Sequence, residues 1–100
     1  MPEIVILAGA ENDILELYVR FENIQDGLGD RFALRIDETL AMIGSNPRIG
    51  TSFRGEIRRC LVKGFPHGVF YSIEARGIIV QTVLDLRQSP EGILRRLENP

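Results

Sequence analysis

The feature that most constrains this chain is the stretch Ile57–Arg87, in which three extended segments are separated by two short turn signals. Gly64 and Pro66 mark the first boundary, and Gly77 marks the second. Branched and aromatic residues dominate each segment, as is typical of strands, whereas Gly and Pro are typical of turns. The stretch therefore predicts three successive antiparallel strands, which form a sheet with one face to bury.

The residues before this sheet carry two apolar stripes at helical spacing. Apolar side chains recur every three or four residues, as one face of a helix requires. The stripes consist of Ala10, Ile14, Leu17, Tyr18 and Phe21, and of Phe32, Ile36, Leu40 and Ile43. Gly27 and Gly29 separate the two helices, and the Asn46-Pro47 pair ends the second one. The sequence thus supplies two amphipathic helices to cover the sheet.

Shorter elements complete the predicted order. Residues 3–7 are β-rich and predict a first strand, and residues 48–56 form a connection that leaves room for a short edge strand. Ser89 and Pro90 can start a last short helix, whose apolar side consists of Ile93, Leu94 and Leu97. We expect an α+β fold in the order β-α-α-β-β-β-α, with both long helices packed on one face of a mostly antiparallel sheet.

Composition indicates a single soluble domain over residues 1–100, since 44% of the residues are hydrophobic and 26% are charged. No apolar run approaches the roughly 18–20 residues that span a bilayer, and no secretory signal is visible. Cys60 stands alone and cannot form an internal disulfide. We therefore expect a cytoplasmic protein.

Charge is distributed unevenly along the chain. Residues 1–45 hold 3 Lys/Arg and 9 Asp/Glu, whereas residues 46–100 hold 9 Lys/Arg and 5 Asp/Glu. The helical half is therefore acidic and the strand-rich half is mildly basic. Two interpretations stay open for the basic half, namely a patch that meets an acidic partner or a phosphate backbone, and an ordinary solvated surface.

Five short segments match a known family in order and spacing. They are Ala10–Ile14, Asn46–Gly50, Ile57–Arg59, Phe65–Tyr71 and Val83–Pro90. In these segments the chain resembles the RelE/ParE superfamily, the toxin subunits of bacterial type II toxin–antitoxin pairs. The resemblance implies a toxin that is held inactive by a cognate antitoxin, as an oligomer with that antitoxin or with itself. It implies no cofactor and no membrane.

The superfamily contains two activities, and the residues of this chain favour one of them. RelE-like members cut messenger RNA on the ribosome with basic side chains and often a late Tyr or His, whereas ParE-like members are associated with poisoning DNA gyrase. Gly68, Asp85 and Gln88 stand where the nuclease branch usually has Arg, His and Arg, and no Tyr or His follows Tyr71. The resemblance therefore favours a ParE-like toxin that binds a target such as DNA gyrase and leans away from an enzyme. The alternatives are a RelE-like ribosome-dependent mRNA endonuclease and a degenerate toxin that only binds its antitoxin.

The residues predicted to contact the antitoxin or the target are Arg58, Arg59, Tyr71, Asp85 and Arg87. Arg58 and Arg59 are adjacent, so on a strand their side chains point to opposite faces. If the chain were a nuclease, these two residues and Arg87 would carry the chemistry. The structural alternatives are a core position for Tyr71 and an ion pair between Asp85 and Arg87.

The single histidine and the single cysteine predict no active site. His67 follows Pro66 in a turn, where a histidine is usually solvated, and a small Cys60 within a strand is ordinary core. The two residues also fall short of a zinc site by number. We therefore expect neither a metal nor a catalytic Cys–His pair.

The predicted layers leave a groove between the two helices and the sheet. An apolar groove of this kind takes a partner helix, and an open sheet edge takes a partner strand. Residues 3–7 and 48–56 are the expected exposed edges. The antitoxin is therefore expected in the groove or along one of these edges.

Overall fold

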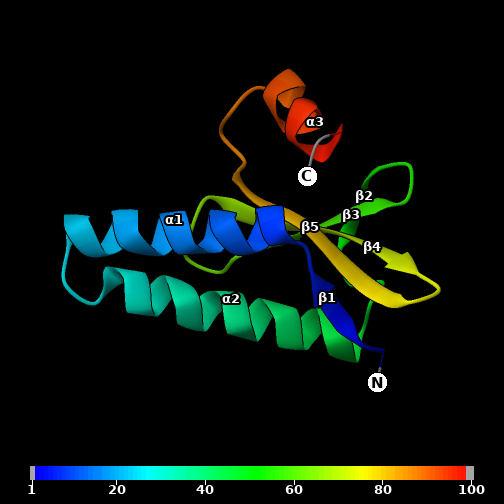
Figure 1. Ribbon diagram of the computed structural model, residues 1–100, viewed down its shortest axis with the longest axis horizontal. Helices are drawn as coiled ribbons and strands as arrows, with labels where there is room; N and C mark the ends of the chain where they lie inside the picture. Colours follow the sequence, from blue (N-terminus) through cyan, green and yellow to red (C-terminus); the bar gives the residue numbers. More distant parts are fainter. Residues whose placement is uncertain (1, 99–100) are drawn as a thin grey trace.

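The computed structural model describes residues 2–98, which fold into three helices and a five-stranded sheet (Figure 1). In chain order the elements are β1 (Ile4–Ile6), α1 (Ala8–Ile24), α2 (Leu28–Ser45), β2 (Thr51–Arg54), β3 (Ile57–Leu61), β4 (His67–Glu74), β5 (Gly77–Asp85) and α3 (Pro90–Glu98). The predicted α+β fold is confirmed. Strand β2 lies within residues 48–56, the connection for which the sequence analysis allowed a short edge strand.

The strands of the sheet lie in the order β1-β5-β4-β3-β2. The pairs β2–β3, β3–β4 and β4–β5 are antiparallel, whereas β1 runs parallel to β5 with Ile4 opposite Ile78. A parallel pair needs a long crossover, and here the helices and the meander supply it. The sheet is therefore mostly antiparallel, as predicted, and its edges are the two expected segments.

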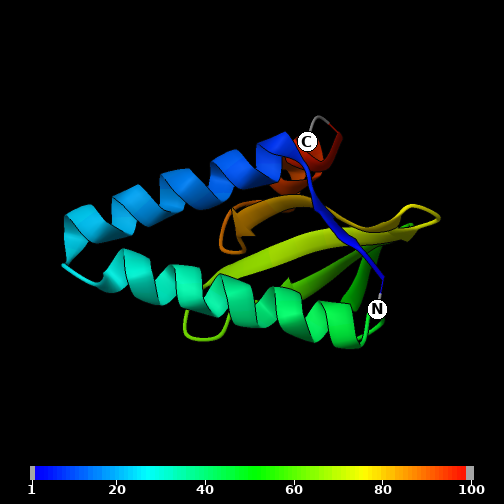
Figure 2. The same cartoon turned by 60° about the horizontal axis from the view of Figure 1, so that its bottom comes forward.

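Helices α1 and α2 form an antiparallel hairpin over one face of the sheet (Figure 2). Gly27, the residue that precedes α2, has a φ of 87° that favours glycine. A Cβ on Gly29 would lie 2.6 Å from the carbonyl oxygen of Tyr18, so only glycine allows this approach of the helices. The carboxylate of Glu22 accepts the Gly29 N–H at 2.8 Å and satisfies a free amide at the start of α2.

The main core lies between the helical hairpin and one face of the sheet. Val69 and Tyr71 of β4 belong to it, as do Ile78 and Val80 of β5, all of them buried. The predicted helical stripes face the same layer; the contributing residues are Ala10, Ile14, Leu17 and Phe21 of α1, and Phe32, Ile36, Leu40 and Ile43 of α2. The predicted stripes are thus confirmed as core at these eight helical positions. Tyr18, the remaining predicted member, lies outside the core, and its hydroxyl donates to Asp30 at 2.6 Å.

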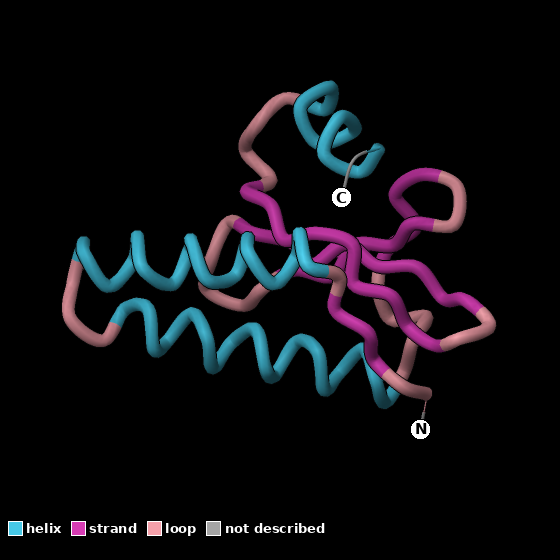
Figure 3. The backbone as a smooth tube through the Cα atoms, viewed as in Figure 1, coloured by secondary structure: helices cyan, strands magenta, loops and turns pink. Residues whose placement is uncertain are grey.

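Helix α3 covers part of the opposite face of the sheet and stands apart from the hairpin in Figure 3. Ile93 packs with Phe70 and Leu84 in a second, smaller cluster, to which Leu97 also belongs. The sheet therefore buries apolar side chains on both faces, where the sequence predicted burial on one. A bulge in β5 contributes to this, because Phe70 pairs with Thr82 while Tyr71 pairs with Val80.

Candidate functional site

The two adjacent arginines of β3 point to opposite faces of the sheet, as the alternation of a strand predicts. Arg58 lies opposite Tyr71 of β4, on the face that the hairpin covers. Arg59 lies opposite Phe70, on the face of α3, and its guanidinium carbon is 5.9 Å from the ring centre of Phe53. The structure therefore separates the two arginines that a nuclease would need at one site.

Arg58 and Tyr71 make hydrogen bonds to the backbone of Pro47 and Gly50, in the connection that follows α2. The Arg58 guanidinium donates to the carbonyl oxygen of Gly50 at 2.8 Å, while the Tyr71 hydroxyl accepts the Gly50 N–H at 2.9 Å. The same hydroxyl donates to the carbonyl oxygen of Pro47 at 2.7 Å. Tyr71 is 0% exposed. Its position fits the core alternative, because a fully buried side chain offers no surface to a partner.

Asp85, the last residue of β5, and Arg87, two residues later, form a local ion pair. The Arg87 guanidinium donates to both carboxylate oxygens of Asp85, at 3.0 and 2.7 Å. The Arg87 side-chain hydrogen bond, together with its backbone N–H and charge, lowers the pKa of Asp85 to about 2. The carboxylate therefore stays ionised near neutral pH and balances the arginine beside it. This arrangement matches the ion-pair alternative predicted for the two residues.

Gly68 lies where the nuclease branch of the superfamily has an arginine, and the structure leaves little room for one. A Cβ at Gly68 would lie 3.1 Å from Cγ of Arg59 and 3.1 Å from a methyl group of Leu86. Any larger side chain would have to push these neighbours aside. The glycine is thus part of the packing on the α3 face.

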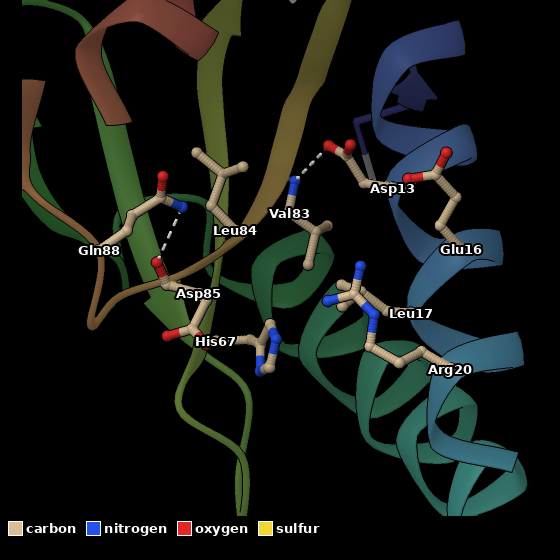
Figure 4. Close-up of a pocket in the computed structure, with 9 residues that line it drawn as sticks. All are labelled: Asp13, Glu16, Leu17, Arg20, His67, Val83, Leu84, Asp85 and Gln88. Carbon is tan, nitrogen blue, oxygen red and sulfur yellow. Dashed lines mark hydrogen bonds between the residues drawn. The ribbon is translucent and has the colours of Figure 1, made fainter. Parts of the chain in front are cut away.

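A small polar pocket of about 180 Å³ opens where α1 meets the ends of β4 and β5 (Figure 4). Its lining residues are Asp13, Glu16, Leu17, Arg20, His67, Val83, Leu84, Asp85 and Gln88. From this set the sequence analysis selected only Asp85 as a binding residue, because the lining comes from three segments, α1, the start of β4 and the end of β5, whose meeting the sequence does not show. The pocket brings Asp85 close to the single histidine, and the remaining predicted residues do not line it.

His67 is the main correction to the sequence analysis. The sequence predicted a solvated histidine in a turn, but the residue begins β4 and is 3% exposed. Its ring lies within 5.5 Å of the ring centre of Phe32 and within 5.7 Å of that of Phe21. Its Nδ1 is buried and finds no hydrogen-bond partner among residues 2–98. The imidazole thus packs as a member of an aromatic cluster, with its edge toward the pocket.

Stability is expected to fall as the pH drops below about 6.5, the value for an unperturbed histidine. Burial lowers the pKa of His67, and Arg87 and Arg20 lower it further, while Asp85 opposes the shift. Below pH 6.5 the unfolded chain binds a proton that the folded chain does not, so the free energy of unfolding decreases until the pH reaches the folded pKa.

Urea unfolding of the wild type and of His67→Phe between pH 7.5 and 5 measures this effect. The variant keeps an aromatic ring in the cluster and lacks the titrating group, so the difference between the two proteins isolates the histidine. A difference that stays constant with pH would contradict the prediction.

Cys60 is buried in β3 and its thiol is free. Burial raises the pKa of the thiol, which keeps it protonated and unreactive. Within residues 2–98, no group of three or more His, Cys, Asp or Glu side chains is placed to hold a metal ion. No helix in the same range is long and apolar enough to cross a membrane.

The helical hairpin on a mostly antiparallel sheet is the fold that the resemblance to the RelE/ParE superfamily implies. The chain belongs to the family described as the ParE toxin of the type II toxin–antitoxin system parDE, whose pattern matches residues 4–90. A solved structure described as the chromosomal ParDE system from P. aeruginosa is similar, with a TM-score of 0.72 and 15% identity over 83% of this chain and 94% of that chain. At this identity the likeness supports the fold alone. No curated protein matches the chain.

Proposed function

We propose that this chain is the toxin of a type II pair that acts in the cytoplasm by binding DNA gyrase and is neutralised by a cognate antitoxin. Membership of the ParE toxin family supports the proposal. The observation that carries the choice between target binding and RNA cleavage is the ion pair of Asp85 with Arg87, at the position where a nuclease would place an acid–base group. This pair, together with the separated arginines, favours a binding protein over an RNA-cleaving enzyme.

RNA cleavage without a metal makes three demands on a site. A 2′-hydroxyl must lose its proton, the charge on the phosphorus-centred intermediate must be stabilised, and the leaving oxygen must gain a proton. Here Asp85 is an ionised carboxylate paired with Arg87, so it holds no proton to donate and the arginine beside it is already engaged. Arg58 is hydrogen bonded to backbone carbonyls, and Arg59 lies over an aromatic ring on the other face. These positions supply neither a converging set of cations nor a proton donor.

We place the antitoxin in the groove between α1 and α2. The groove has a volume of about 320 Å³, and its surface is mainly apolar. Its lining residues are Ile6, Glu11, Ile14, Leu15, Tyr18, Ala33, Ile36, Asp37 and Leu40. A groove of this composition suits the apolar face of an amphipathic helix. Glu11 and Asp37 at its rim favour a helix with basic residues on its flanks.

Two assays run in parallel test the proposal. The purified chain is expected to inhibit supercoiling by DNA gyrase, and to cut no messenger RNA in a ribosome-dependent cleavage assay. Adding a purified cognate antitoxin is expected to restore supercoiling. RNA cleavage that is lost in Arg87→Ala would overturn the proposal in favour of the nuclease. Silence in both assays would leave a degenerate toxin that only binds its antitoxin.

A further inference from the structure

A second polar pocket opens at the edge of the sheet, beside β2 and the connection that leads to it from α2. We call it the edge pocket. Its volume is about 260 Å³ and its surface is mainly polar. Its lining residues are Arg48, Ser52, Gly55, Glu56, Arg58 and Ile73. It shares no residue with the pocket beside His67 or with the groove assigned to the antitoxin, so it is a separate site.

Arg58 brings to the edge pocket a charge that no carboxylate balances. The residue is half-buried, and none of the ion pairs formed within residues 2–98 includes it. Its hydrogen bonds both come from Nη1, which donates to the carbonyl oxygens of Arg48 at 3.3 Å and of Gly50 at 2.8 Å. Arginines removed from water are normally paired with an acid. The guanidinium is thus fixed in place while its charge stays available to a ligand.

The remaining donors of Arg58 have the geometry that recognises an oxyanion. The five N–H groups of a guanidinium lie in one plane, and those of Nε and Nη2 point side by side from one edge. Neither Nε nor Nη2 makes a hydrogen bond to the part of the chain that the structure describes. Two parallel N–H groups of this kind bind the two oxygens of a carboxylate, or two of those of a phosphate. Because Nη1 already holds the plane, little side-chain freedom is lost when a ligand binds.

Two further donors and one carboxylate complete the lining. Ser52 lies opposite Arg58 in the antiparallel pair of β2 with β3, so both side chains stand on the same face of the sheet. Arg48 is exposed and belongs to no ion pair of the described residues. Glu56, on the turn between β2 and β3, is the acid of the lining. Two arginines and one glutamate leave the edge pocket with one positive charge in excess.

We propose that the edge pocket binds a ligand carboxylate, which accepts two hydrogen bonds from the Arg58 fork and further ones from Arg48 and Ser52. The single charge of a carboxylate matches the one charge in excess. A phosphate monoester carries about −1.5 to −2 near neutral pH, and Glu56 would repel the charge left over. The pocket holds roughly ten non-hydrogen atoms, by comparison with a cavity of about 150 Å³ that binds benzene. The ligand is therefore a small carboxylic acid or the acidic side chain of a peptide.

Titration of the isotope-labelled chain, followed by nuclear magnetic resonance near neutral pH and at low salt, tests the proposal. One probe is acetate, a free acid, and the other is N-acetyl-aspartate N-methylamide, an aspartate side chain between two peptide groups. The backbone amide signals of Ser52, Gly55 and Arg58 are expected to shift, with a dissociation constant on the order of 1–10 mM. Tighter binding of the aspartate probe assigns a peptide side chain as the ligand, and equal binding assigns a free acid. Inorganic phosphate is expected to bind more weakly than either probe.

Four variants separate carboxylate binding from the structural role of Arg58. Arg58→Lys keeps the charge but lacks the fork, so it is expected to weaken binding by about tenfold or more. Arg48→Ala and Ser52→Ala are each expected to weaken it by about threefold. Glu56→Gln removes the opposing charge and is expected to strengthen binding by about twofold. If Arg58 did no more than hold the backbone, the last three variants would leave binding unchanged.

Arg31→Ala is the matched control, since Arg31 is exposed and takes part in no ion pair of the described chain. It lies in the first turn of α2, at the end of the helix away from the edge pocket. This variant is expected to bind the probes like the wild type, and circular dichroism verifies that every variant is folded. Tighter binding of phosphate, equal shifts around all arginines, or unchanged binding in both Arg48→Ala and Ser52→Ala would overturn the inference. None of these results bears on gyrase inhibition, because the inference rests on the edge pocket alone.

Discussion

Replacing Phe32 with alanine is expected to lower the free energy of unfolding by about 3–5 kcal/mol. The Phe32 side chain is 0% exposed, and its ring centre lies 5.1 Å from that of Phe21 and 5.0 Å from that of Phe65. These rings, with His67, join α1 and α2 to the start of β4. Removing the central ring leaves a cavity that the flanking aromatic side chains fill only in part. Urea unfolding followed by circular dichroism measures the loss.

Leu34→Ala is the control, because Leu34 lies on the same helix and is 57% exposed. Its replacement is expected to change the free energy of unfolding by no more than about 0.5 kcal/mol. A loss below about 1 kcal/mol for Phe32→Ala would show that the aromatic cluster is not packed as described.

The two long helices and the three strands of the meander could be predicted from the sequence because their determinants are local. The stripe from Phe32 to Ile43 follows helical spacing, and each of its predicted members meets the core. The turns of the meander are marked by glycines with positive φ angles, Gly64 between β3 and β4 and Gly77 at the start of β5. In these segments the local secondary-structure preference agrees with the burial of the apolar residues, so the apolar pattern alone is enough to predict the elements.

The pairing of β1 with β5 could not be predicted in the same way. Ile4 lies opposite Ile78, and nothing in the sequence near either residue specifies the other. The bulge at Gln81 was also hidden, because it shifts the alternation of β5 so that Val80 and Val83 both face the main core. Such features depend on contacts between distant segments, which periodicity does not reveal.

In the candidate site, too, the features set by neighbouring residues could be predicted, and those set by distant contacts could not. The pair of Asp85 and Arg87 was predicted as an alternative because the two residues are neighbours in sequence, and alternation placed Arg58 and Arg59 on opposite faces. The burial of His67 was missed, since a histidine after Pro66 carries no sign of the phenylalanine rings that surround it. Its environment forms only when the helical hairpin meets the sheet.

Asp13 illustrates the contacts that the sequence could not show. The sequence places it in an early turn of α1, where a carboxylate favours the helix dipole. In the structure its carboxylate accepts hydrogen bonds from the Thr82 hydroxyl at 2.6 Å and from the Val83 N–H at 3.1 Å. It also pairs with Arg96 of α3, while its side chain is only 13% exposed. One carboxylate therefore links α1, β5 and α3.

Asp13→Ala is expected to lower the free energy of unfolding by about 3 kcal/mol, because it leaves the Val83 N–H and the Thr82 hydroxyl unpaired and removes the ion pair with Arg96. Thr82→Val removes one of these bonds at nearly constant volume and is expected to cost about 1 kcal/mol.

Glu11→Ala, which removes an exposed carboxylate of the same helix turn, is the control and should change the free energy of unfolding by less than about 0.5 kcal/mol. Urea unfolding gives the three values, and limited proteolysis reports on α3, which should be cut faster in Asp13→Ala than in Thr82→Val. Equal losses for Asp13→Ala and Glu11→Ala would mean that the carboxylate does not join these elements.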